Sequence, residues 1–397
     1  MYFQLRLNRK EKSRCNLTDG MKKLPWIKLS IFIFIFLGCN REIQKSDLVN
    51  LEFDFNDLIK TSFWSLFGID QIIELNVDTT GHYIYPVSKV FLTNKDSTFI
   101  IYSRDLYQKL VYVYRGGVKY QSINRWGGSE GIYNFSGVTD CQVKNDSIYL
   151  MDYLKGKIRT FDLNMIEGNS IPLPYSYRSF QLLGENQIVF DTDGLSNGSD
   201  GDHEVALLNR ESGETTSFLK VNPNTYLQMG MENERYSNEI GEHCYYVRQY
   251  DPCIYRMDGD LRSISLQYCL TFKPDRFLLL NKEDDIKDLN RKLSEENGVF
   301  RYFCPIQSEI GLGFFIPNST LFQSYFLWVQ DDQVKGYNIE EKNLIGRLPL
   351  NAMSDSRFAA ILEQDNTKAR ALLSDKVVLK DNRDYVIVYR LKDQFLK

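Results

Sequence analysis

A recurrence of strand ends every 47 residues constrains the fold of this chain more than any other feature. The strands in question end, 47 residues apart, at Tyr114, Phe161, Leu208 and Tyr255. Each is preceded by a second short run of β-forming residues, such as DSIYLMDY from Asp146, so every unit contains a hairpin. A β-rich period of this length, punctuated by turns, is typical of propeller blades rather than helical solenoids.

Two further units follow, with strand ends at Tyr337 and Tyr389, which makes six. The chain therefore predicts an all-β, six-bladed propeller over residues 51–397. Helical spacing of apolar residues predicts short insertions near 281–297 and 354–373, the second beginning in the stretch DSRFAAIL from Asp355. We expect the strands LEFDF from Leu51 and QIIELNV from Gln71 to supply the outer strand of the last blade, because a closed ring hides its sheet edges.

The N-terminal region has the pattern of an export signal. Lys22, Lys23 and Lys28 form a basic segment, the apolar run 31–37 follows it, and Gly38-Cys39 comes next. The run is short for a membrane span, which favours a cleaved signal peptide over residues 1–38. Translation from Met21 would give the same signal without the first 20 residues.

This segment resembles the bacterial lipoprotein signal. The residues Phe36-Leu37-Gly38-Cys39 would be the lipobox, with Phe36 in place of the more usual leucine, and Cys39 would be the acylated first residue of the mature protein. The polar residues 39–50 would then be a lipidated tether. We expect the protein to be anchored at the cell envelope, and Asn40-Arg41 leaves the choice of inner or outer membrane open.

Charge and cysteine content narrow the possible partners. Without residues 1–38 the chain keeps 40 basic and 50 acidic residues, a formal charge of −10, so we expect no nucleic-acid partner. Five cysteines remain after the signal and Cys39, and an odd number leaves at least one thiol unpaired within a monomer. Cys244 and Cys253 lie on two strands joined by a short turn and could pair, or both could stay buried as thiols.

The stretch from Gln71 to Asn164 resembles the six-bladed β-propeller lipoproteins of Gram-negative bacteria, whose blades are similar to NHL repeats. The matching positions are Ile73, Leu75, Tyr114, Gly116, Gly127, Gly131, Tyr133, Asp146, Ile148, Tyr149, Asp152, Lys157, Ile158, Phe161 and Asp162. The sequence departs from the family pattern at Ser129, Glu130 and Ile132. The resemblance implies a fold and an envelope location, and it brings no catalytic residues.

The sequence GGSEG from Gly127 to Gly131 matches the G-x-S-x-G of a hydrolase nucleophile elbow. Such an elbow needs a long helix directly after the serine, whereas turn and strand residues follow Ser129. A glycine-rich connection between two blades fits the segment better.

An acidic, glycine-rich loop is the candidate metal site. It contains Asp191, Asp193, Asp200 and Asp202, beside His203 and Glu204. Carboxylate oxygens on a flexible loop suit calcium, although the EF-hand pattern is absent. A solvated hairpin loop without metal is the other interpretation.

Aromatic residues give the candidate ligand surface: Trp126, Tyr133, Tyr325 and Trp328. Propellers bind through loops on one face, whereas aromatic residues of blades also pack in the core. We therefore expect a monomeric binding or scaffold module for a protein partner or extracellular polymer. The alternative is an enzyme acting on extracellular glycan or peptide, with calcium as its possible cofactor.

Overall fold

The computed structural model of the chain describes most residues from Leu48 onward. The described residues are 48–75, 87–93, 98–103, 109–115, 118–124, 137–174, 177, 179–192, 203–220, 236–237, 239–248, 251–259, 263–275, 303–317, 324–341, 344, 350–352 and 356–395. All of them belong to one compact unit, Ile43–Lys397, which is separate from Met1–Glu42.

The first three blades each consist of four consecutive strands, and the neighbouring strands within each blade are antiparallel. The first contains β4 (Val87–Leu92), β5 (Thr98–Ser103), β6 (Lys109–Arg115) and β7 (Val118–Asn124). The second contains β8 (Val138–Lys144), β9 (Ser147–Asp152), β10 (Lys157–Asp162) and β11 (Ile171–Pro172), with the short turn η2 (Tyr153–Lys155) after β9. The third contains β12 (Ser179–Leu183), β13 (Gln187–Asp191), β14 (His203–Asn209) and β15 (Thr215–Lys220).

The fourth, fifth and sixth blades follow. The fourth contains β16 (His243–Val247), β17 (Cys253–Asp258) and β18 (Ser263–Lys273), and bridges from Tyr236 and Ile240 to β16 mark its innermost segment. The fifth contains β19 (Phe303–Gln307), β20 (Leu312–Pro317), β21 (Ser324–Gln330) and β22 (Gln333–Ile339). The sixth contains β23 (Leu350–Ala352), β24 (Arg357–Leu362), β25 (Asp384–Leu391) and β3 (Phe67–Leu75).

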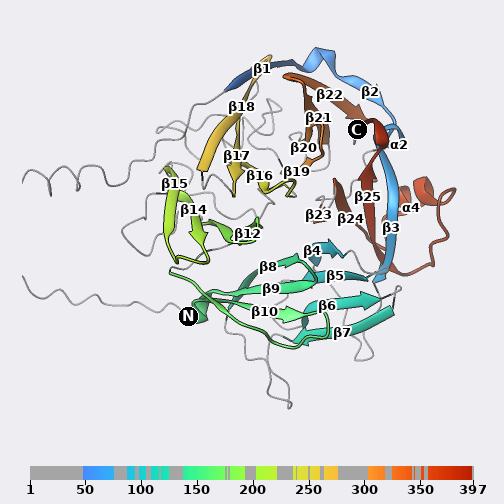
Figure 1. Ribbon diagram of the computed structural model, residues 1–397. Coiled ribbons are helices and arrows are strands. Elements are labelled where there is room, and N and C mark those ends of the chain that lie inside the picture. The colour runs from blue at the N-terminus through green and yellow to red at the C-terminus, as the bar shows by residue number, and fades with distance from the viewer. Residues whose placement is uncertain are drawn as a thin grey trace, which may run out of the picture. The chain divides into compact units, whose positions relative to one another are not determined.

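These six groups of strands are the blades of a propeller, arranged around a common centre (Figure 1). The first and sixth blades are joined through β4 and β23 into one eight-stranded sheet. One hydrophobic cluster lies between each pair of neighbouring blades, and buried side chains from both blades contribute to it. Val90 of the first blade and Val386 of the sixth share one of these clusters, and β23 pairs with β4 through Ala352 and Val90. The ring is therefore closed, and the predicted six-bladed all-β fold is confirmed.

The N-terminal strap, which we define as residues 49–66, runs along the outside of the last three blades. It contains β1 (Val49–Asp54), η1 (Phe55–Asp57), β2 (Ile59–Thr61) and α2 (Phe63–Leu66). β1 pairs in parallel with β18 and β2 in parallel with β22, before β3 completes the sixth blade as its outer strand. The prediction for QIIELNV is thus correct, whereas LEFDF lies on the fourth blade and not on the last one.

Side chains of the strap fill the seam between the fourth and fifth blades. Leu51, Phe53 and Phe55 are buried there, and Phe53 contacts Phe55 and Phe272 edge to face. Gly336 of β22 has no side chain, and a Cβ at that position would lie 2.1 Å from Cζ of Phe53. The strap therefore packs directly on the backbone of the fifth blade.

A carboxylate fixes the end of the strap. Glu341 accepts hydrogen bonds from Oγ of Ser62 at 2.7 Å and from the backbone N–H of Phe63 at 2.6 Å. It thereby satisfies an N–H at the start of α2, where a negative charge is also favourable.

Two sequence predictions about the last blades need correction. Tyr337 lies on β22, the fourth strand of its blade, whereas Tyr114, Phe161, Leu208, Tyr255 and Tyr389 all lie on third strands. Within the described part of the insertion predicted near 354–373, helix is confined to α4 (Thr367–Leu373), because residues 357–362 form β24. Pairing of β24 between β23 and β25 outweighs the helix propensity of its alanines.

The insertion predicted at 281–297 and the signal over residues 1–38 lie outside the described residues. Among the residues that are described, no helix has the length and apolar character needed to cross a membrane.

Candidate functional site

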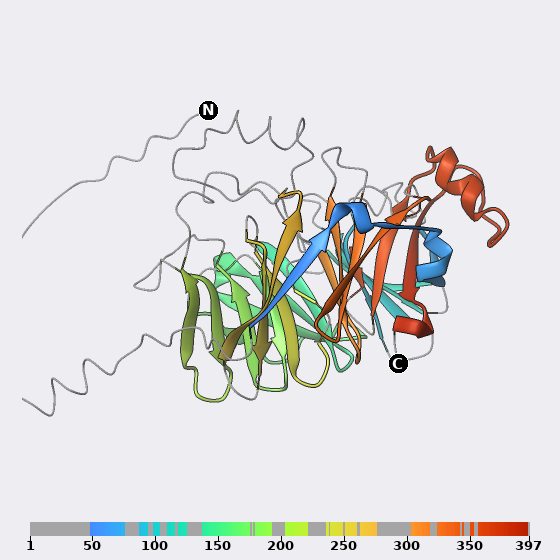
Figure 2. The ribbon, with the colours of Figure 1, turned by 90° about the horizontal axis from the view of Figure 1, so that it is seen from above.

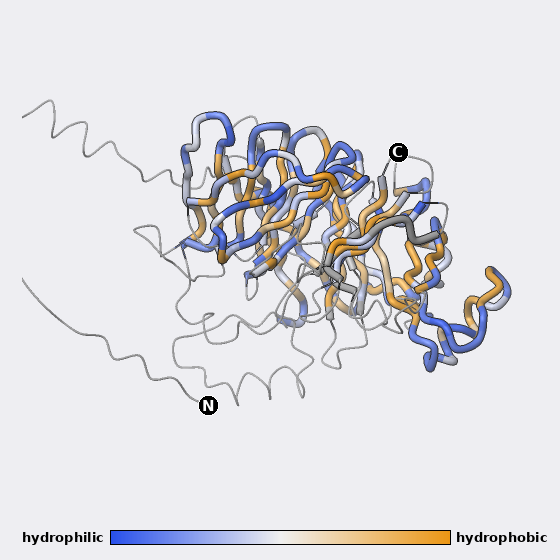
Figure 3. The backbone as a smooth tube through the Cα atoms, turned by 90° about the horizontal axis from the view of Figure 1, so that it is seen from below, coloured by the Kyte–Doolittle hydropathy of each residue, from blue (hydrophilic) through white to orange (hydrophobic). Residues whose placement is uncertain are grey.

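The two faces of the ring differ in the connections that they carry. On one face, first strands lead to second strands and third strands to fourth strands, mostly through tight turns such as 145–146, 184–186 and 331–332. We call it the tight-turn face; Figure 2 shows turns of this kind side by side along one edge, and they are mostly hydrophilic in Figure 3. On the opposite, long-connection face, second strands lead to third strands through residues 153–156, 192–202, 248–252 and 363–383. The connections on the long-connection face therefore differ in length between blades, from residues 153–156 in the second blade to residues 363–383 in the sixth.

One residue of the predicted aromatic surface lies in the core. Trp328 is only 2% exposed and packs on Phe326 and Phe395 in the core between the fifth and sixth blades. Gly311 and Gly313 make room for its ring, since a Cβ at Gly311 would lie 2.5 Å from it. Trp328 is thus unavailable to a surface ligand.

Tyr325, three residues earlier on β21, is half-buried. Its ring lies 5.8 Å from that of Phe55 in the strap. Trp126 and Tyr133, the other two predicted ligand residues, lie outside the described residues.

The structure describes only the two ends of the predicted calcium loop, residues 191–192 and 203–204. Asp191, at the end of β13, is 4% exposed, whereas Asp193, Asp200 and Asp202 fall outside the described residues. Across the described ranges, no group of three or more His, Cys, Asp or Glu side chains is arranged to hold a metal ion. The calcium prediction for Asp191, Asp193, Asp200 and Asp202 therefore stays a prediction.

Glu204, beside that loop, belongs to a charged network between the third and fourth blades. Arg248 donates to Oε2 of Glu204 through Nε at 2.9 Å and to Oε1 through Nη2 at 2.7 Å. The same guanidinium also reaches Oδ2 of Asp251 at 3.3 Å and the carbonyl of Lys220 at 3.0 Å. Arg248 thus joins two blades on the long-connection face by a bidentate salt bridge to Glu204, and bidentate pairs are among the strong hydrogen-bonded ion pairs.

Burial and charge shift the ionisation in this network. Burial would lower the pKa of the Arg248 guanidinium, but the hydrogen bonds and charge of Glu204 outweigh it and raise that pKa. Burial, together with the Asp251 carboxylate, raises the pKa of Tyr255, whose hydroxyl donates to Asp251 at 2.7 Å. Arg248 stays charged and pairs with both carboxylates, so the network holds the third and fourth blades together.

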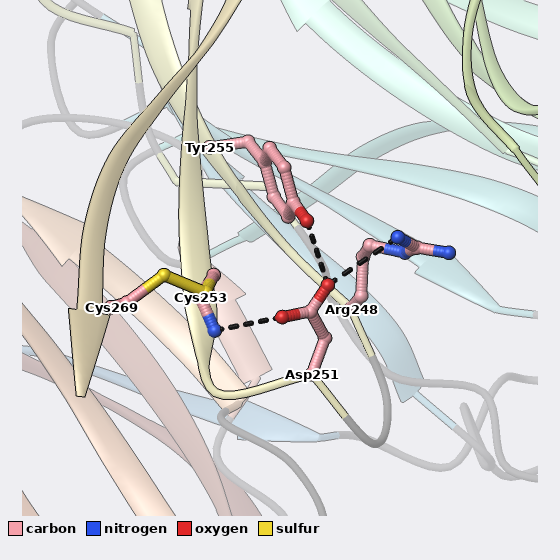
Figure 4. The surroundings of a disulfide bond; sticks show 5 residues. All are labelled: Arg248, Asp251, Cys253, Tyr255 and Cys269. Carbon is pink, nitrogen blue, oxygen red and sulfur yellow. Dashed lines mark hydrogen bonds and ion pairs between the residues drawn. A yellow bond between two sulfur atoms is a disulfide. The ribbon is translucent and has the colours of Figure 1, made fainter. Parts of the chain in front are cut away.

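A disulfide lies directly beside this network (Figure 4). Cys253 of β17 is bonded to Cys269 of β18, and the N–H of Cys253 donates to Oδ1 of Asp251 at 2.9 Å. The pairing considered for Cys244 and Cys253 does not form, because Cys244 lies opposite Met257 in the sheet register. Cys253 instead faces Cys269 directly across β17 and β18.

The buried thiols Cys141 and Cys244 are inert. Burial, strengthened by neighbouring carboxylates, raises the pKa of both thiols, so they stay protonated. A protonated buried thiol is a poor nucleophile and a poor metal ligand.

A row of polar side chains on β8 connects the second and third blades near the ring centre. Asp140, Gln142 and Lys144 alternate along β8 and lie on one side of it. Asp140 accepts from the N–H of Phe180 at 2.9 Å, and Gln142 donates to the carbonyl of the same residue at 2.7 Å. The side chains of this row therefore satisfy the backbone N–H and carbonyl groups of Phe180 on β12, as a neighbouring strand would.

The two ends of this row reach further blades. Lys89 of the first blade pairs with Asp140 at 2.8 Å, and both side chains are buried. Lys144 donates to the carbonyl of Gly184 at 2.5 Å and pairs with Glu239 of the fourth blade at 2.7 Å. Four consecutive blades are thus joined by charged and amide side chains whose partners are backbone groups or opposite charges.

His243 extends the polar contacts to the fifth blade. Its Nε2 lies 2.9 Å from Nε2 of Gln307, and Oε1 of Gln307 lies 3.2 Å from Oγ of Ser237. Burial, and then the charge of Arg256, lower the pKa of His243. A neutral ring can accept from the Gln307 amide, so this histidine acts as a blade contact.

Sequence reasoning did not find these interblade residues. The only signal in the sequence was that polar residues at positions 140, 142 and 144 alternate with Cys141 and Val143. The described polar groups hold the blades together. The loops of the long-connection face are therefore the candidate binding surface.

Comparison with known proteins agrees with the architecture. A family profile described as "6-bladed beta-propeller" matches residues 54–311. No curated protein matches the chain in sequence.

Solved structures with a similar fold include a protein from Bacteroides fragilis described as exported, with a TM-score of 0.64 and 13% identity over 87% of this chain and 100% of that one. A member of the duf4221 family from Bacteroides vulgatus has a TM-score of 0.50 and 10% identity over 82% of this chain and 98% of that one. Virginiamycin B lyase from Staphylococcus aureus scores 0.43 at 10% identity, covering 74% of this chain and 81% of that one. At such identities the similarity concerns the fold alone.

Proposed function

This chain belongs to the 6-bladed beta-propeller family, and from that premise we propose that it is an exported, lipid-anchored module that binds a protein or extracellular polymer through its long-connection face. The observation that carries the proposal is that the scaffold contacts and the long connections belong to different parts of the ring. Tight turns and interblade polar contacts build a rigid scaffold, and the long connections stand together on one face of it. Binding sites are typically placed on such loops of a rigid scaffold.

Export has three independent supports. The basic segment, apolar run and Gly38-Cys39 step make an export signal with a lipidation site. The Cys253–Cys269 disulfide suits an oxidising compartment outside the cytoplasm. The structural relative from Bacteroides fragilis is described as an exported protein.

Lipid attachment is tested by metabolic labelling. The full chain, expressed in a Gram-negative host with radioactive palmitate, should carry label in the membrane fraction. Cys39→Ser should lose the label and accumulate as unprocessed precursor, and Cys141→Ser, at a buried thiol, should keep both label and processing. A labelled Cys39→Ser protein, or an unlabelled parent, would contradict the anchor.

The ligand class is tested by thermal unfolding of residues 43–397 with calcium, a chelator, oligosaccharides and peptides. A ligand at about 100 times its Kd adds roughly 2.7 kcal/mol to the free energy of unfolding, which raises Tm measurably. A shift with an oligosaccharide or peptide identifies the polymer, and a shift with calcium alone supports the loop at residues 193–202. No shift with any of them directs the search to a folded protein partner.

A further inference from the structure

The connection between β24 and β25 forms a projection from the sixth blade. We define the α4 projection as residues 366–383; it extends beyond the blades in Figure 2. Its base is rigid: Ala369 and Leu373 are buried against the interblade core, and the amide of Ala369 donates to Oδ1 of Asn366 at 3.1 Å. The far end is braced as well, since the N–H of Lys380 donates to the Tyr385 hydroxyl at 2.9 Å.

The outer side of this projection combines an exposed apolar side chain with basic ones. In the segment KVVLK, Val377 and Leu379 face the core, whereas Val378 is 99% exposed between Lys376 and Lys380. Leu372, on α4, is a second exposed apolar residue at 36%. Figure 3 shows a hydrophobic stretch at the far end of the projection with hydrophilic residues around it.

The projection has the opposite charge to the chain as a whole. Residues 366–383 contain five Lys and Arg residues against two Asp, a formal charge of +3, while the whole chain carries −4. Lys380 and Arg383 pair with Glu74 of β3 at 2.8 and 3.6 Å, so the projection together with this carboxylate keeps a charge of +2. Lys368 and Lys376 are exposed, and Nζ of Lys376 lies 5.9 Å from the ring centre of Trp64. An apolar tip within a basic surface complements the boundary of an anionic bilayer, where acyl chains meet negatively charged headgroups.

We infer that the α4 projection contacts an anionic membrane surface, with Val378 entering the headgroup region and Lys368 and Lys376 meeting the lipid phosphates. Few side chains take part, so binding of the free domain is weak. It becomes effective when the domain is held near the bilayer. The nine residues 40–48 between the proposed anchor Cys39 and β1 span at most about 32 Å, so an anchored ring stays close to the lipid.

The tether argument rests on the proposed lipid anchor, but the surface itself does not. The inference also refines the proposed function. The projection belongs to the long-connection face, so its contact would place the rim of that face at the membrane, where a membrane-bound partner can reach it.

Vesicle binding of residues 43–397, which lack Cys39 and retain every described strand, tests the inference. Co-sedimentation is compared for vesicles of phosphatidylcholine alone and vesicles with phosphatidylglycerol added. We expect binding only with phosphatidylglycerol and a loss of binding at high salt. Val378→Asp should reduce the partition coefficient at least fivefold, and Lys376→Gln should reduce it about fivefold, as expected for removal of one basic residue near an anionic surface.

Ile166→Asp is the matched control, because Ile166 is 65% exposed on the tight-turn face. It should bind vesicles like the parent. Equal binding to both vesicle types, or an unchanged Val378→Asp variant, would overturn the inference. So would a concentration-dependent dimer in sedimentation velocity that Val378→Asp abolishes, since the apolar tip would then bind a second copy of the chain. Palmitate labelling at Cys39 is measured separately, so failure of the anchor and failure of this surface are distinguishable.

Discussion

The contact between Gly336 and Phe53 predicts a strong energetic coupling between the strap and the fifth blade. Phe53 is 3% exposed, and a Cβ added at Gly336 would lie 2.1 and 2.4 Å from two atoms of its ring. Gly336→Ala must displace the ring, which we expect to cost about 1–3 kcal/mol, as for other overpacked cores. Phe53→Ala removes the ring and leaves a cavity, at a cost of about 3–5 kcal/mol.

The double variant separates this contact from general damage. The three atoms nearest to a Cβ at Gly336 are two ring atoms of Phe53 and, at 3.0 Å, Cδ2 of Leu327, so removing the ring relieves the two closest contacts. The double variant should therefore lose less stability than the two single variants added together, by about 1 kcal/mol or more. Urea denaturation of residues 43–397 measures all four free energies of unfolding. Gly68→Ala, where nothing lies within 4 Å of the added Cβ, is the control and should change stability by less than about 0.5 kcal/mol. Additive costs would refute the packing of the strap on β22.

Three further predictions concern the interblade contacts. Asp140→Asn removes the carboxylate that pairs with the buried Lys89 at 2.8 Å and should cost about 3–5 kcal/mol in urea denaturation; a cost below about 1 kcal/mol would contradict a buried pair. Replacing Cys253 and Cys269 by serine opens a loop with a sequence separation of 16 and should cost about 3 kcal/mol, whereas an unchanged midpoint in the absence of reductant would show that the bond does not form. The lowered pKa of His243 means that the unfolded chain binds its proton more readily, so stability should fall as the pH falls below 6.5; His243→Asn should reduce that loss, and an unchanged pH profile would contradict the assignment.

The blades could be predicted because their hairpins have a local signature. Strands β5, β9 and β13 are buried on both faces, so they appear in the sequence as continuous apolar runs, and tight turns separate them from their partners. The same logic placed the fifth unit one strand out of phase. The hairpin β21–β22 has the same pattern of strand, two-residue turn and strand as a second-to-third strand pair.

Long-range pairing could not be predicted. β1 is parallel to β18, with Val49 opposite Tyr268, and no local pattern announces a partner more than 200 residues away. The disulfide depends on register in the same way: a register shift between Ile254 and Tyr255 accompanies the placement of Cys253 opposite Cys269.

The candidate ligand residues show the limit of residue type as evidence. Trp328 was chosen as an aromatic residue that could line a surface, but Gly313, opposite it on β20, and Gly311, just before β20, make room for its ring in the core. An aromatic residue facing glycines across a strand pair is a packing signal, and the sequence alone does not reveal that they face each other. The polar row on β8 was missed for a related reason, because its partners belong to the backbone of another blade.

Site-specific photo-cross-linking in intact cells tests the central claim most directly. Leu154 and Ile166 both belong to the second blade and are 60% and 65% exposed, but Leu154 lies on the long-connection face and Ile166 on the tight-turn face. A photoreactive amino acid at each position of the full chain should give a discrete adduct at 154 and none at 166. Adducts at 166 alone, or the same adducts at both positions, would contradict a binding role for the long-connection face.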